Sequence, residues 1–406
     1  MYIFKAAVVG AGAMGAGIAQ VISYSGLPVV LKDIDQGMLD KGMSHVRKIY
    51  QGRVDKGKMS ASELDSKMAL VTPALDYGEF ADVDIVIEAV PERMELKKRV
   101  YAELDAVCPE GAIFASNTSA LSISEMGGTT KRPHKMIGMH FFNPAHVMKL
   151  VEIIRGEETD EETVQDVVTF TESLRKIPVV VKECPGFLVN RLLTPYLNEA
   201  TLALQEGAAT AQDIDGAMVD YGWPMGPFTL MDFLGLDVCH DVGVYLSSQY
   251  GERMQGVILF EKLVQAGRLG EKSGAGFYGY GDQTDEPVQR IIAEISGALR
   301  GKPSEFSPER LMYLMLNEAA RCVEEDIADV RDIDMAMIAG TGMAVNGERI
   351  GPLALADRIG IDVLVAGLED FEKKCGKRFH PADMLYTLVK EGRTGEKARA
   401  GFLEYV

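Results

Sequence analysis

The feature that most constrains the fold is a glycine turn near the N-terminus, Gly10-Ala-Gly12-Ala-Met-Gly15. It follows a short apolar run with β-branched residues at 3–9, and it precedes helical spacing over about 14–25. Glycines at these positions allow a tight strand-to-helix turn, and they let a pyrophosphate approach the backbone N–H groups at the helix N-terminus. The turn therefore predicts a dinucleotide site, with Gly10, Gly12 and Gly15 as cofactor-binding residues.

Asp33 bears on which dinucleotide binds. It ends a second predicted strand at 28–33, eighteen residues after Gly15. A carboxylate at this place suits the ribose hydroxyls of NAD and would repel the additional phosphate of NADP. Lys32 is its neighbour, but successive residues of a strand point to opposite faces. NAD is the expected cofactor; the alternatives are NADP and a glycine-rich turn that binds no nucleotide.

Strands and helical segments alternate up to about residue 185. A helical, partly basic stretch covers about 36–68, and further strand candidates are DIVIEAV (84–90), AIFAS, KMIGMHF, KLVEII and IPVVVK (177–182). This alternation predicts an α/β fold with a parallel, doubly wound sheet. After Pro185-Gly186 the periodicity becomes mostly helical, so a domain boundary is expected near 185.

The helical part contains an internal repeat. At an offset of 119, residues 191–200 align with 310–319 and 213–218 with 332–337; at an offset of 125, Gly226-Pro227 aligns with Gly351-Pro352 and Gly276-Phe277 with Gly401-Phe402. Gly, Pro, Asn and Asp stay in register throughout, which indicates a duplicated unit. We therefore predict three domains: a nucleotide-binding domain at 1–185, a first helical copy at 186–300 and a second at 301–406.

Composition excludes several classes of protein. The 60 acidic residues against 42 Lys and Arg give a net charge of −18, which disfavours general binding to nucleic acid or to an anionic membrane. The five cysteines are scattered and form no CxxC pair, so neither a disulfide framework nor a zinc site is expected, and a cytoplasmic location is the simplest. No apolar run is long enough to predict a transmembrane helix.

Three polar residues are candidates for catalysis. His140 ends the apolar segment MIGMH, where doubly wound sheets bind ligands, and it could be a general base or an ordinary core histidine. Glu152, twelve residues further on, could pair with His140 and raise its basicity, or it could lie on a solvent-facing strand face. Ser119 belongs to the polar cluster 116–119, which could cap the next helix or bind a substrate oxygen.

Six segments together resemble the 3-hydroxyacyl-CoA dehydrogenase family. In chain order they are GAGAMGAGIAQ, EAVPE with a downstream lysine, FASNTSALSI, GMHFFNPAHVMKLVE, CPGFLVNRLL and YGWPMGPFTLMDFLGLD. They match in order and spacing over roughly residues 3–280, and the repeat extends the likeness to about 406. The resemblance implies a Rossmann-type sheet followed by two tandem all-α domains. It also implies NAD-dependent oxidation of an (S)-3-hydroxyacyl-CoA to a 3-ketoacyl-CoA, or the reverse reduction.

The resemblance also implies roles for single residues. His140 would be the general base in oxidation and the acid in reduction, oriented by Glu152. Ser119 would contact the 3-oxygen of the substrate, and Asn190 would help to hold the substrate. The positions where the family has cofactor-neighbouring residues are Glu92, Lys97 and Asn143. Without the resemblance, Asn190 would be an ordinary helix residue, and Glu92 and Lys97 could form an ion pair at a helix start.

A basic segment matches the negative charge of coenzyme A. Residues 41–58 carry six Lys or Arg residues and a single Asp, which is +5 in an acidic chain. Such a run is often only a solvated face, but here it falls in the helical insertion where the family receives CoA. We expect it to bind the substrate, with Lys56 and Lys58 as candidate contacts.

The chain departs from short family members in its second helical copy. Glu309 aligns with Asn190, and no PGF precedes it, so the second copy is interpreted as structural. We expect it to pack on the first copy with pseudo-twofold symmetry, in the place of a partner subunit. The chain would then be a monomer with an internal pseudo-dimer, or a homodimer through another surface. No enoyl-CoA hydratase domain precedes Met1, so hydratase activity is not expected.

Two other functions stay open. One is a β-hydroxyacid dehydrogenase that acts on a free acid, and the other is a non-catalytic NAD-binding relative. Enzymes of the first kind favour a lysine as the base and an arginine for the carboxylate, whereas the His140 and Glu152 pair and the basic segment favour the acyl-CoA substrate. The resemblance implies lipid metabolism, with fatty-acid β-oxidation, fermentative reduction and carbon fixation as alternative settings.

Overall fold

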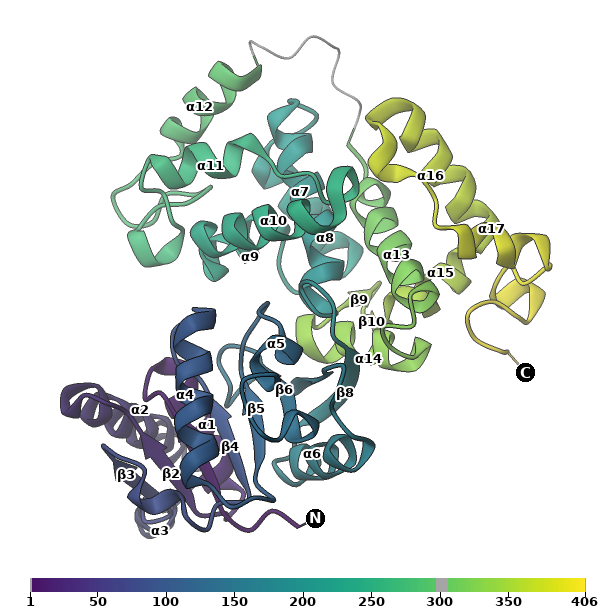
Figure 1. The fold of residues 1–406 in the computed structure, drawn as a ribbon. Coiled ribbons are helices and arrows are strands. Elements are labelled where there is room, and N and C mark those ends of the chain that lie inside the picture. Colours follow the sequence, from purple (N-terminus) through teal and green to yellow (C-terminus); the bar gives the residue numbers. More distant parts are fainter. Residues whose placement is uncertain (1, 297–305, 406) are drawn as a thin grey trace. The chain divides into compact units, whose positions relative to one another are not determined.

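An eight-stranded sheet organises the N-terminal part of the chain (Figure 1). The computed structural model describes residues 2–296 and 306–405, and the chain divides into two units, Met1–Phe187 and Leu188–Val406. The strands are β1 (Ala6–Val9), β2 (Val29–Lys32), β3 (Val71–Ala74), β4 (Ile85–Glu88), β5 (Ile113–Ser116), β6 (Met136–Phe141), β7 (Leu150–Arg155) and β8 (Ile177–Lys182). Their order in the sheet is β3-β2-β1-β4-β5-β6-β7-β8.

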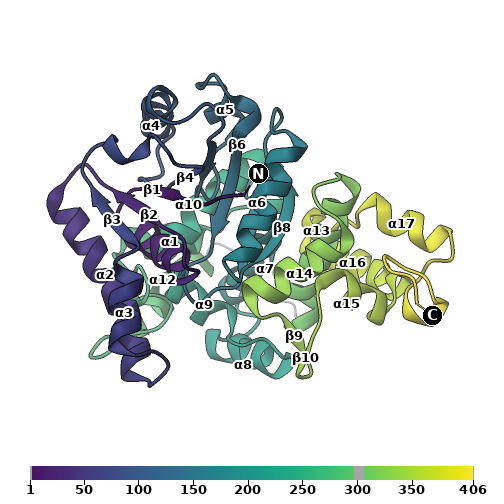
Figure 2. The same cartoon turned by 90° about the horizontal axis from the view of Figure 1, so that it is seen from below.

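Helices cover both faces of this sheet. They are α1 (Ala13–Tyr24), α2 (Gln36–Asp55), α3 (Ala61–Met68), α4 (Met94–Val107), α5 (Ile123–Gly127) and α6 (Glu161–Ser173). One buried cluster joins the sheet to α1, α2, α3 and α6, and a second joins it to α4 and α5. In Figure 2, α4 and α5 lie on one side of the strands and α2 and α3 on the other. The doubly wound sheet and the helical region that follows it are confirmed.

The sheet differs from the prediction in three places. β6 and β7 pair antiparallel, whereas all other neighbours in the sheet are parallel. The strand β3 was not predicted, because Pro73 interrupts its pattern; proline is tolerated there since β3 lies at the edge. The predicted helix at 36–68 is two helices, because Ser60 and Glu63 form a capping box that starts α3.

The second unit is almost entirely helical. Its helices are α7 (Val189–Gln205), α8 (Ala211–Tyr221), α9 (Pro227–Leu234), α10 (Leu236–Tyr250), α11 (Ile258–Gln265), α12 (Glu286–Ser296), α13 (Pro308–Glu324), α14 (Val330–Thr341), α15 (Pro352–Ile359), α16 (Ile361–Cys375) and α17 (Asp383–Lys390). A short hairpin joins β9 (Ala344–Val345) to β10 (Glu348–Arg349). The predicted boundary between the two copies, at 300/301, lies outside the described residues.

Matched ion pairs join the two halves of the helical unit. The Nε of Arg191 on α7 donates to Glu318 on α13 at 2.7 Å, and the Nε of Arg310 on α13 donates to Glu199 on α7 at 2.6 Å. Each residue of one pair lies 119 positions from its counterpart in the other. Both arginine side chains are fully buried. Because a buried charge is costly without its partner, these contacts fix how α7 and α13 can pack together.

One buried carboxylate breaks this symmetry. Asp215 accepts hydrogen bonds at the start of α9 and a further one, at 2.9 Å, from the hydroxyl of Tyr278. Its counterpart Asp334 accepts from two backbone N–H groups at the start of α15, at 2.7 and 3.0 Å, but Leu403 stands where the first copy has Tyr278. Burial and the nearby Asp357 raise the pKa of Asp334 to about 6.

The first prediction concerns the buried ion pairs. Arg191→Met removes the closest cation from Glu318, whose remaining cations, Arg253 and Arg321, lie at 3.7 and 4.0 Å. We expect the free energy of unfolding to fall by about 3 kcal/mol, because a buried carboxylate then keeps only distant partners. Chemical denaturation measures the change.

Arg310→Met is the matched control for this variant. It leaves Glu199 with Arg378, whose Nε lies 2.6 Å from the carboxylate. The loss of stability should therefore be smaller than in Arg191→Met. An equal loss in both variants would contradict the expected dependence on the remaining cation.

The second prediction concerns pH. The pKa of Asp334 is higher in the folded chain than in the unfolded chain, so folding takes up a proton and stability falls as the pH rises from about 4 to about 6. Leu403→Tyr would supply the missing phenol donor, lower this pKa and reduce the loss, which is about 3 kcal/mol at most. Unfolding curves between pH 4 and pH 7 test this, with Asp334→Asn as the control that removes the titration. An unchanged pH dependence in Leu403→Tyr would refute the role of the phenol.

Candidate active site

His140 and Glu152 form a buried pair across two strands. β6 and β7 are antiparallel, and their register places the two residues directly opposite each other. The Nδ1 atom of His140 lies 2.6 Å from Oε2 of Glu152. The histidine side chain is 7% exposed and the glutamate side chain is not exposed. The structure therefore brings together the two residues for which the sequence predicted a pairing.

This pairing determines which nitrogen of the ring can react. A carboxylate beside Nδ1 favours the tautomer that carries its proton on Nδ1, which leaves Nε2 able to accept a proton. The ring centroid lies 4.6 Å from that of Phe142 and 5.9 Å from that of Phe187, so aromatic side chains limit the movement of the imidazole. The arrangement is suited to a general base with a fixed orientation.

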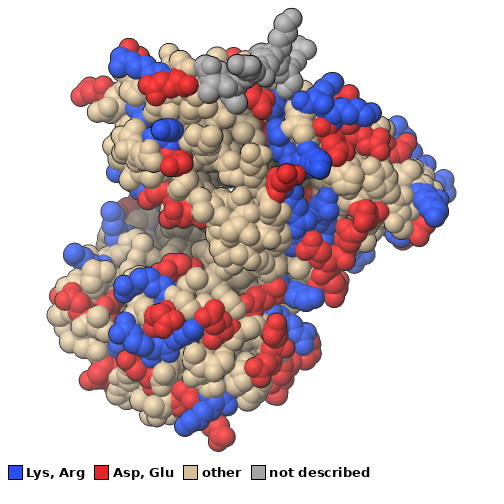
Figure 3. Space-filling model, turned by 45° about the horizontal axis from the view of Figure 1, so that its top comes forward, with Lys and Arg blue, Asp and Glu red and all other residues tan. Residues whose placement is uncertain are grey.

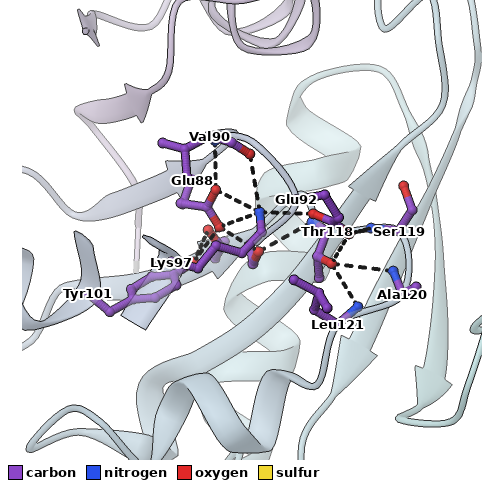
Figure 4. A network of polar contacts seen from close by, with 11 residues as sticks. Glu88, Val90, Glu92, Lys97, Tyr101, Thr118, Ser119, Ala120 and Leu121 are labelled. Carbon is purple, nitrogen blue, oxygen red and sulfur yellow. Dashed lines mark hydrogen bonds and ion pairs between the residues drawn. The ribbon is translucent and has the colours of Figure 1, made fainter. Parts of the chain in front are cut away.

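A second buried ion pair lies at the ends of the neighbouring strands (Figure 4). Lys97 on α4 is 1% exposed, and its Nζ lies 2.8 and 3.0 Å from the two carboxylate oxygens of Glu88, the last residue of β4. The hydroxyl of Ser116, at the end of β5, donates to the same carboxylate at 2.7 Å. Sequence reasoning did not identify Glu88. The available signal was an acidic residue at the end of an apolar strand, the same pattern that identified Asp33.

Glu92 connects this ion pair to Ser119. Its Oε2 lies 3.2 Å from Nζ of Lys97, and its Oε1 accepts hydrogen bonds from the Thr118 hydroxyl at 2.5 Å and from the Ser119 backbone N–H at 2.9 Å. Figure 4 shows the Ser119 hydroxyl pointing away from this network. The side chain of Ser119 is thus available for a ligand, while its backbone is fixed by Glu92.

The segment that carries Ser119 is also tied to the histidine strand. The side-chain oxygen of Asn117, directly after β5, accepts a hydrogen bond of 2.8 Å from the backbone N–H of Phe141. Phe141 follows His140 at the end of β6. The Ser119 segment and His140 therefore lie at the same edge of the sheet, where parallel strands place their ligands.

The glycine turn has the shape that a dinucleotide needs. Gly10 has a φ of +104°, and a Cβ there would lie 2.6 Å from the Ala89 carbonyl oxygen. A Cβ on Gly15 would lie 1.8 Å from the carbonyl oxygen of Gly10, so glycine is required at both places for the strand and helix to approach. A Cβ on Gly12 would meet no atom within 4 Å, which leaves open space over the start of α1 for a pyrophosphate.

Asp33 belongs to this turn. Its Oδ2 accepts a hydrogen bond of 2.7 Å from the backbone N–H of Ala11, and its Oδ1 accepts one of 2.7 Å from Ile34. Lys32 is buried, with its ammonium 4.3 Å from the ring centroid of Tyr77. The residues present fit NAD: glycines for the pyrophosphate and a half-buried carboxylate at the end of β2 for the ribose.

The other predicted site residues lie in different settings. Lys97 is buried and contacts two carboxylates, that of the buried Glu88 and that of the exposed Glu92. Asn143 is exposed and precedes Pro144, to which it is joined by a cis peptide bond. Asn190 belongs to the helical unit, where it is half-buried in the first turn of α7. Among the described residues, no group of His, Cys, Asp and Glu side chains could hold a metal ion.

A basic cavity of about 690 Å³ lies beside α2. The cationic residues that line it are Lys48, Arg53, Lys56, Lys58, Lys149, Arg175 and Lys176, and its lining includes no Asp or Glu. On the face of the molecule in Figure 3, by contrast, side chains of both signs occur throughout. The cavity therefore concentrates positive charge in an acidic chain, and it includes the predicted Lys56 and Lys58.

Sequence reasoning missed three of the seven cationic residues that line this cavity. Lys149, Arg175 and Lys176 come from segments far from α2, so no local run of charge indicated them. Arg53, within the predicted segment, is already oriented: its Nη2 donates to the Tyr24 hydroxyl at 2.7 Å, and its guanidinium lies 4.6 Å from the Tyr24 ring centroid.

Comparison with known families agrees with this geometry. Residues 5–184 match the family model of the 3-hydroxyacyl-CoA dehydrogenase NAD binding domain, and residues 186–280 and 306–405 match that of the 3-hydroxyacyl-CoA dehydrogenase C-terminal domain. The chain belongs to the 3-hydroxyacyl-CoA dehydrogenase family, a family of oxidoreductases. The resemblance found in the sequence and the expected cofactor, NAD, are confirmed.

The chain is similar to individual relatives over most of its length. The fatty acid oxidation complex subunit alpha of Shewanella amazonensis is 39% identical over 400 residues, which cover 97% of this chain and 56% of that protein. The chain thus spans a little over half the length of the curated relatives it matches. The crystal structure of Escherichia coli K12 3-hydroxybutyryl-CoA dehydrogenase has a TM-score of 0.86 at 30% identity, with 97% of this chain and 100% of that chain covered. That of (S)-3-hydroxybutyryl-CoA dehydrogenase from Ralstonia eutropha has a TM-score of 0.67 at 39% identity, covering 69% and 100%.

No helix in the described ranges 2–296 and 306–405 is both long enough and apolar enough to span a membrane.

The third prediction concerns cofactor choice. Asp33→Ser should weaken NADH binding roughly tenfold, because it removes the charged acceptor for the Ala11 N–H and for the ribose. The same change should reduce the discrimination against NADPH, whose phosphate Asp33 would repel. Fluorescence titration with each cofactor measures both effects.

Asp35→Ser is the control for this variant. Asp35 is exposed and caps α2 by accepting a hydrogen bond from Met38, a role that serine also performs. Its affinities should stay close to those of the unmodified chain. Equal changes in both variants would show that general loss of negative charge, rather than Asp33, governs cofactor choice.

Proposed function

We propose that the chain catalyses the reversible, NAD-dependent oxidation of an (S)-3-hydroxyacyl-CoA to a 3-ketoacyl-CoA. The observation that carries the proposal is the buried pair of His140 and Glu152, with 2.6 Å between Nδ1 and Oε2, at the ligand-binding edge of a sheet with an NAD-binding turn. Membership of the dehydrogenase family supports the reaction class.

In oxidation, Nε2 of His140 would remove the proton from the 3-hydroxyl of the substrate. NAD⁺, when bound, supplies the acceptor for the hydride from C3. The imidazolium formed on His140 would be stabilised by the adjacent carboxylate of Glu152, which is fully buried and acts at short range. In the reverse direction His140 would return the proton to the 3-oxygen of the ketone.

Five further residues are assigned roles in this proposal. Ser119 would donate to the 3-oxygen, and the hydrogen bond that its backbone N–H donates to Glu92 supports its position. Asn190 would help to hold the substrate. Asn143 and Glu92 are proposed to lie beside the cofactor. Lys97 would act there through the orientation it gives to Glu92, because its ammonium already contacts two carboxylates.

The basic cavity is proposed to bind the phosphates of coenzyme A. Seven cationic side chains without a lining carboxylate suit a group with several negative charges, whereas a small free acid would need only one or two. Lys56 and Lys58 are exposed at this cavity, and Arg53 is held ready by Tyr24. The names of the relatives, which include a fatty acid oxidation subunit and 3-hydroxybutyryl-CoA dehydrogenases, favour acyl-CoA substrates over free acids.

The duplicated helical region is proposed to comprise a first copy at 186–300 and a structural second copy at 301–406. The exchanged ion pairs between α7 and α13 support packing with pseudo-twofold symmetry. Glu309 stands where the first copy has Asn190, which supports the assignment of the second copy as structural. The internal pair would take the place of a dimer, so a monomer is favoured. The cysteine pattern supports a cytoplasmic location.

The proposal is tested by following NADH absorbance after adding acetoacetyl-CoA. We expect rapid loss of NADH with the thioester, and no comparable loss with free acetoacetate or with NADPH in place of NADH. His140→Ala should lower kcat by about 10²- to 10⁴-fold, because it removes the group that transfers the proton.

Glu152→Gln separates orientation from proton transfer. It keeps a partner for Nδ1 but removes the charge that stabilises the imidazolium, so kcat should fall while NADH affinity stays the same. Turnover of acetoacetate at the rate of the thioester would instead support a free-acid dehydrogenase. Full activity of His140→Ala, or NADH binding without turnover of any thioester in a chain-length series, would refute the proposed function.

A further inference from the structure

Lys176 holds the connection between the two strands that carry His140 and Glu152. It directly precedes β8 and is 8% exposed. Its Nζ donates to the carbonyl oxygen of Ala145 at 2.5 Å and to that of Met148 at 2.6 Å. Both carbonyls belong to the turn 142–149, which joins β6 to β7. One ammonium therefore binds two points of the turn that separates the catalytic histidine from its carboxylate.

Backbone hydrogen bonds also shape this turn. The N–H groups of Val147 and Met148 both donate to the Pro144 carbonyl, at 2.9 and 3.0 Å, which closes one tight loop within it. Its far end is fixed to the next strand, because the N–H of Ile177 donates to the Lys149 carbonyl at 2.9 Å. Lys176 supplies the link between that strand and the middle of the turn.

The same side chain also lines the basic cavity beside α2. In the described part of the chain, Lys176 makes no ion pair with a carboxylate; its contacts are to carbonyl oxygens. Burial and the nearby Lys149 lower the pKa of Lys176 to about 8. Burying a cation without an anionic partner costs free energy. A phosphate group in the cavity would supply a negative charge beside the Lys176 ammonium.

We propose that Lys176 is a positioning residue that couples occupancy of the basic cavity by a phosphate-bearing group to the placement of the turn between His140 and Glu152. The proposal rests on the proposed function, since it takes His140 as the base and the CoA phosphates as the occupant. A phosphate in the cavity would stabilise the charged ammonium, and the charged ammonium binds the carbonyls of the turn more strongly. Substrate binding at a distance would thus improve catalytic geometry at His140.

The first test compares three variants with acetoacetyl-CoA and NADH. Lys176→Met should lower kcat about tenfold and also raise KM, because a small displacement of catalytic groups has a large effect on rate. Lys176→Arg should restore kcat to within about twofold, since a guanidinium keeps the charge and can donate to two carbonyls. Lys48→Met removes a charge of the same cavity from α2, outside the turn, and Lys48 donates to neither carbonyl, so this variant should raise KM and change kcat less than twofold.

The second test supplies the phosphates separately. The substrate is acetoacetyl-pantetheine, which lacks the nucleotide, and the probe is adenosine 3′,5′-bisphosphate. In the unmodified chain the bisphosphate should raise kcat for the truncated thioester severalfold. In Lys176→Met it should have no effect on kcat, whereas in Lys48→Met the increase should persist at a higher bisphosphate concentration.

Several results would overturn the proposal. They are a change in KM alone in Lys176→Met, an equal response of Lys176→Met and the unmodified chain to the bisphosphate, and no response of the unmodified chain. NADH binding and thermal unfolding show whether Lys176→Met folds, and Lys176→Gln replaces it if it does not. A large loss of kcat in Lys176→Arg would also contradict the proposal. Failure of the proposed function is distinct, because the unmodified chain would then turn over neither thioester.

Discussion

The antiparallel pairing of β6 with β7 is the constraint on which the site depends. In a parallel sheet, two neighbouring strands are joined by a long crossover, and residues twelve positions apart do not face each other. A short connection reverses the chain here, and the register then places His140 opposite Glu152. A carboxylate with no exposed surface is stable in a sheet only with close polar partners, and His140 supplies one of them to Glu152. The single antiparallel pair of strands thus brings His140 and Glu152 together at the edge where the parallel strands end.

Buried charge organises the rest of the chain in the same way. Glu88 and Lys97 are both almost completely buried, and together they fix Glu92 and the backbone of Ser119. A pair of this kind adds little net stability, because each ion loses its hydration, but a wrong arrangement would leave a charge unpaired. The ion pair of Glu88 and Lys97 instead determines the position of the segment that follows β5. The Asn117 hydrogen bond to the end of β6 then transmits that position to the strand of His140.

The sequence was informative where the signal is local. The glycine turn and Asp33 could be read from a few adjacent residues, because the backbone conformation of each position limits which residues fit. The pair of His140 and Glu152 required an assumption about strand pairing, and the antiparallel step itself was not foreseen. Lys176 was missed, since its contacts join segments about thirty residues apart and no periodicity marks them. The edge strand β3 was missed because Pro73 interrupts the local strand pattern. Proline is tolerated there because β3 lies at the edge of the sheet.

The two halves of the helical unit share some residues and differ at others. The ion-pair residues that join the halves occur in both, whereas some positions outside that contact differ. The residues that make the exchanged ion pairs occur at matching positions in both halves of the helical unit. Arg191 pairs with Glu318 and Arg310 with Glu199, so each half supplies a partner to the other. Positions outside that interface are free of this reciprocal constraint. Glu309 has replaced the asparagine of the first copy, and it lies in the first turn of α13, where a negative charge is favourable. Leu403 has replaced Tyr278 although the acid beside it is still buried. The second half of the helical unit therefore shares the ion-pair residues of the first and differs from it at Glu309 and Leu403, as the proposed structural role of the second copy requires.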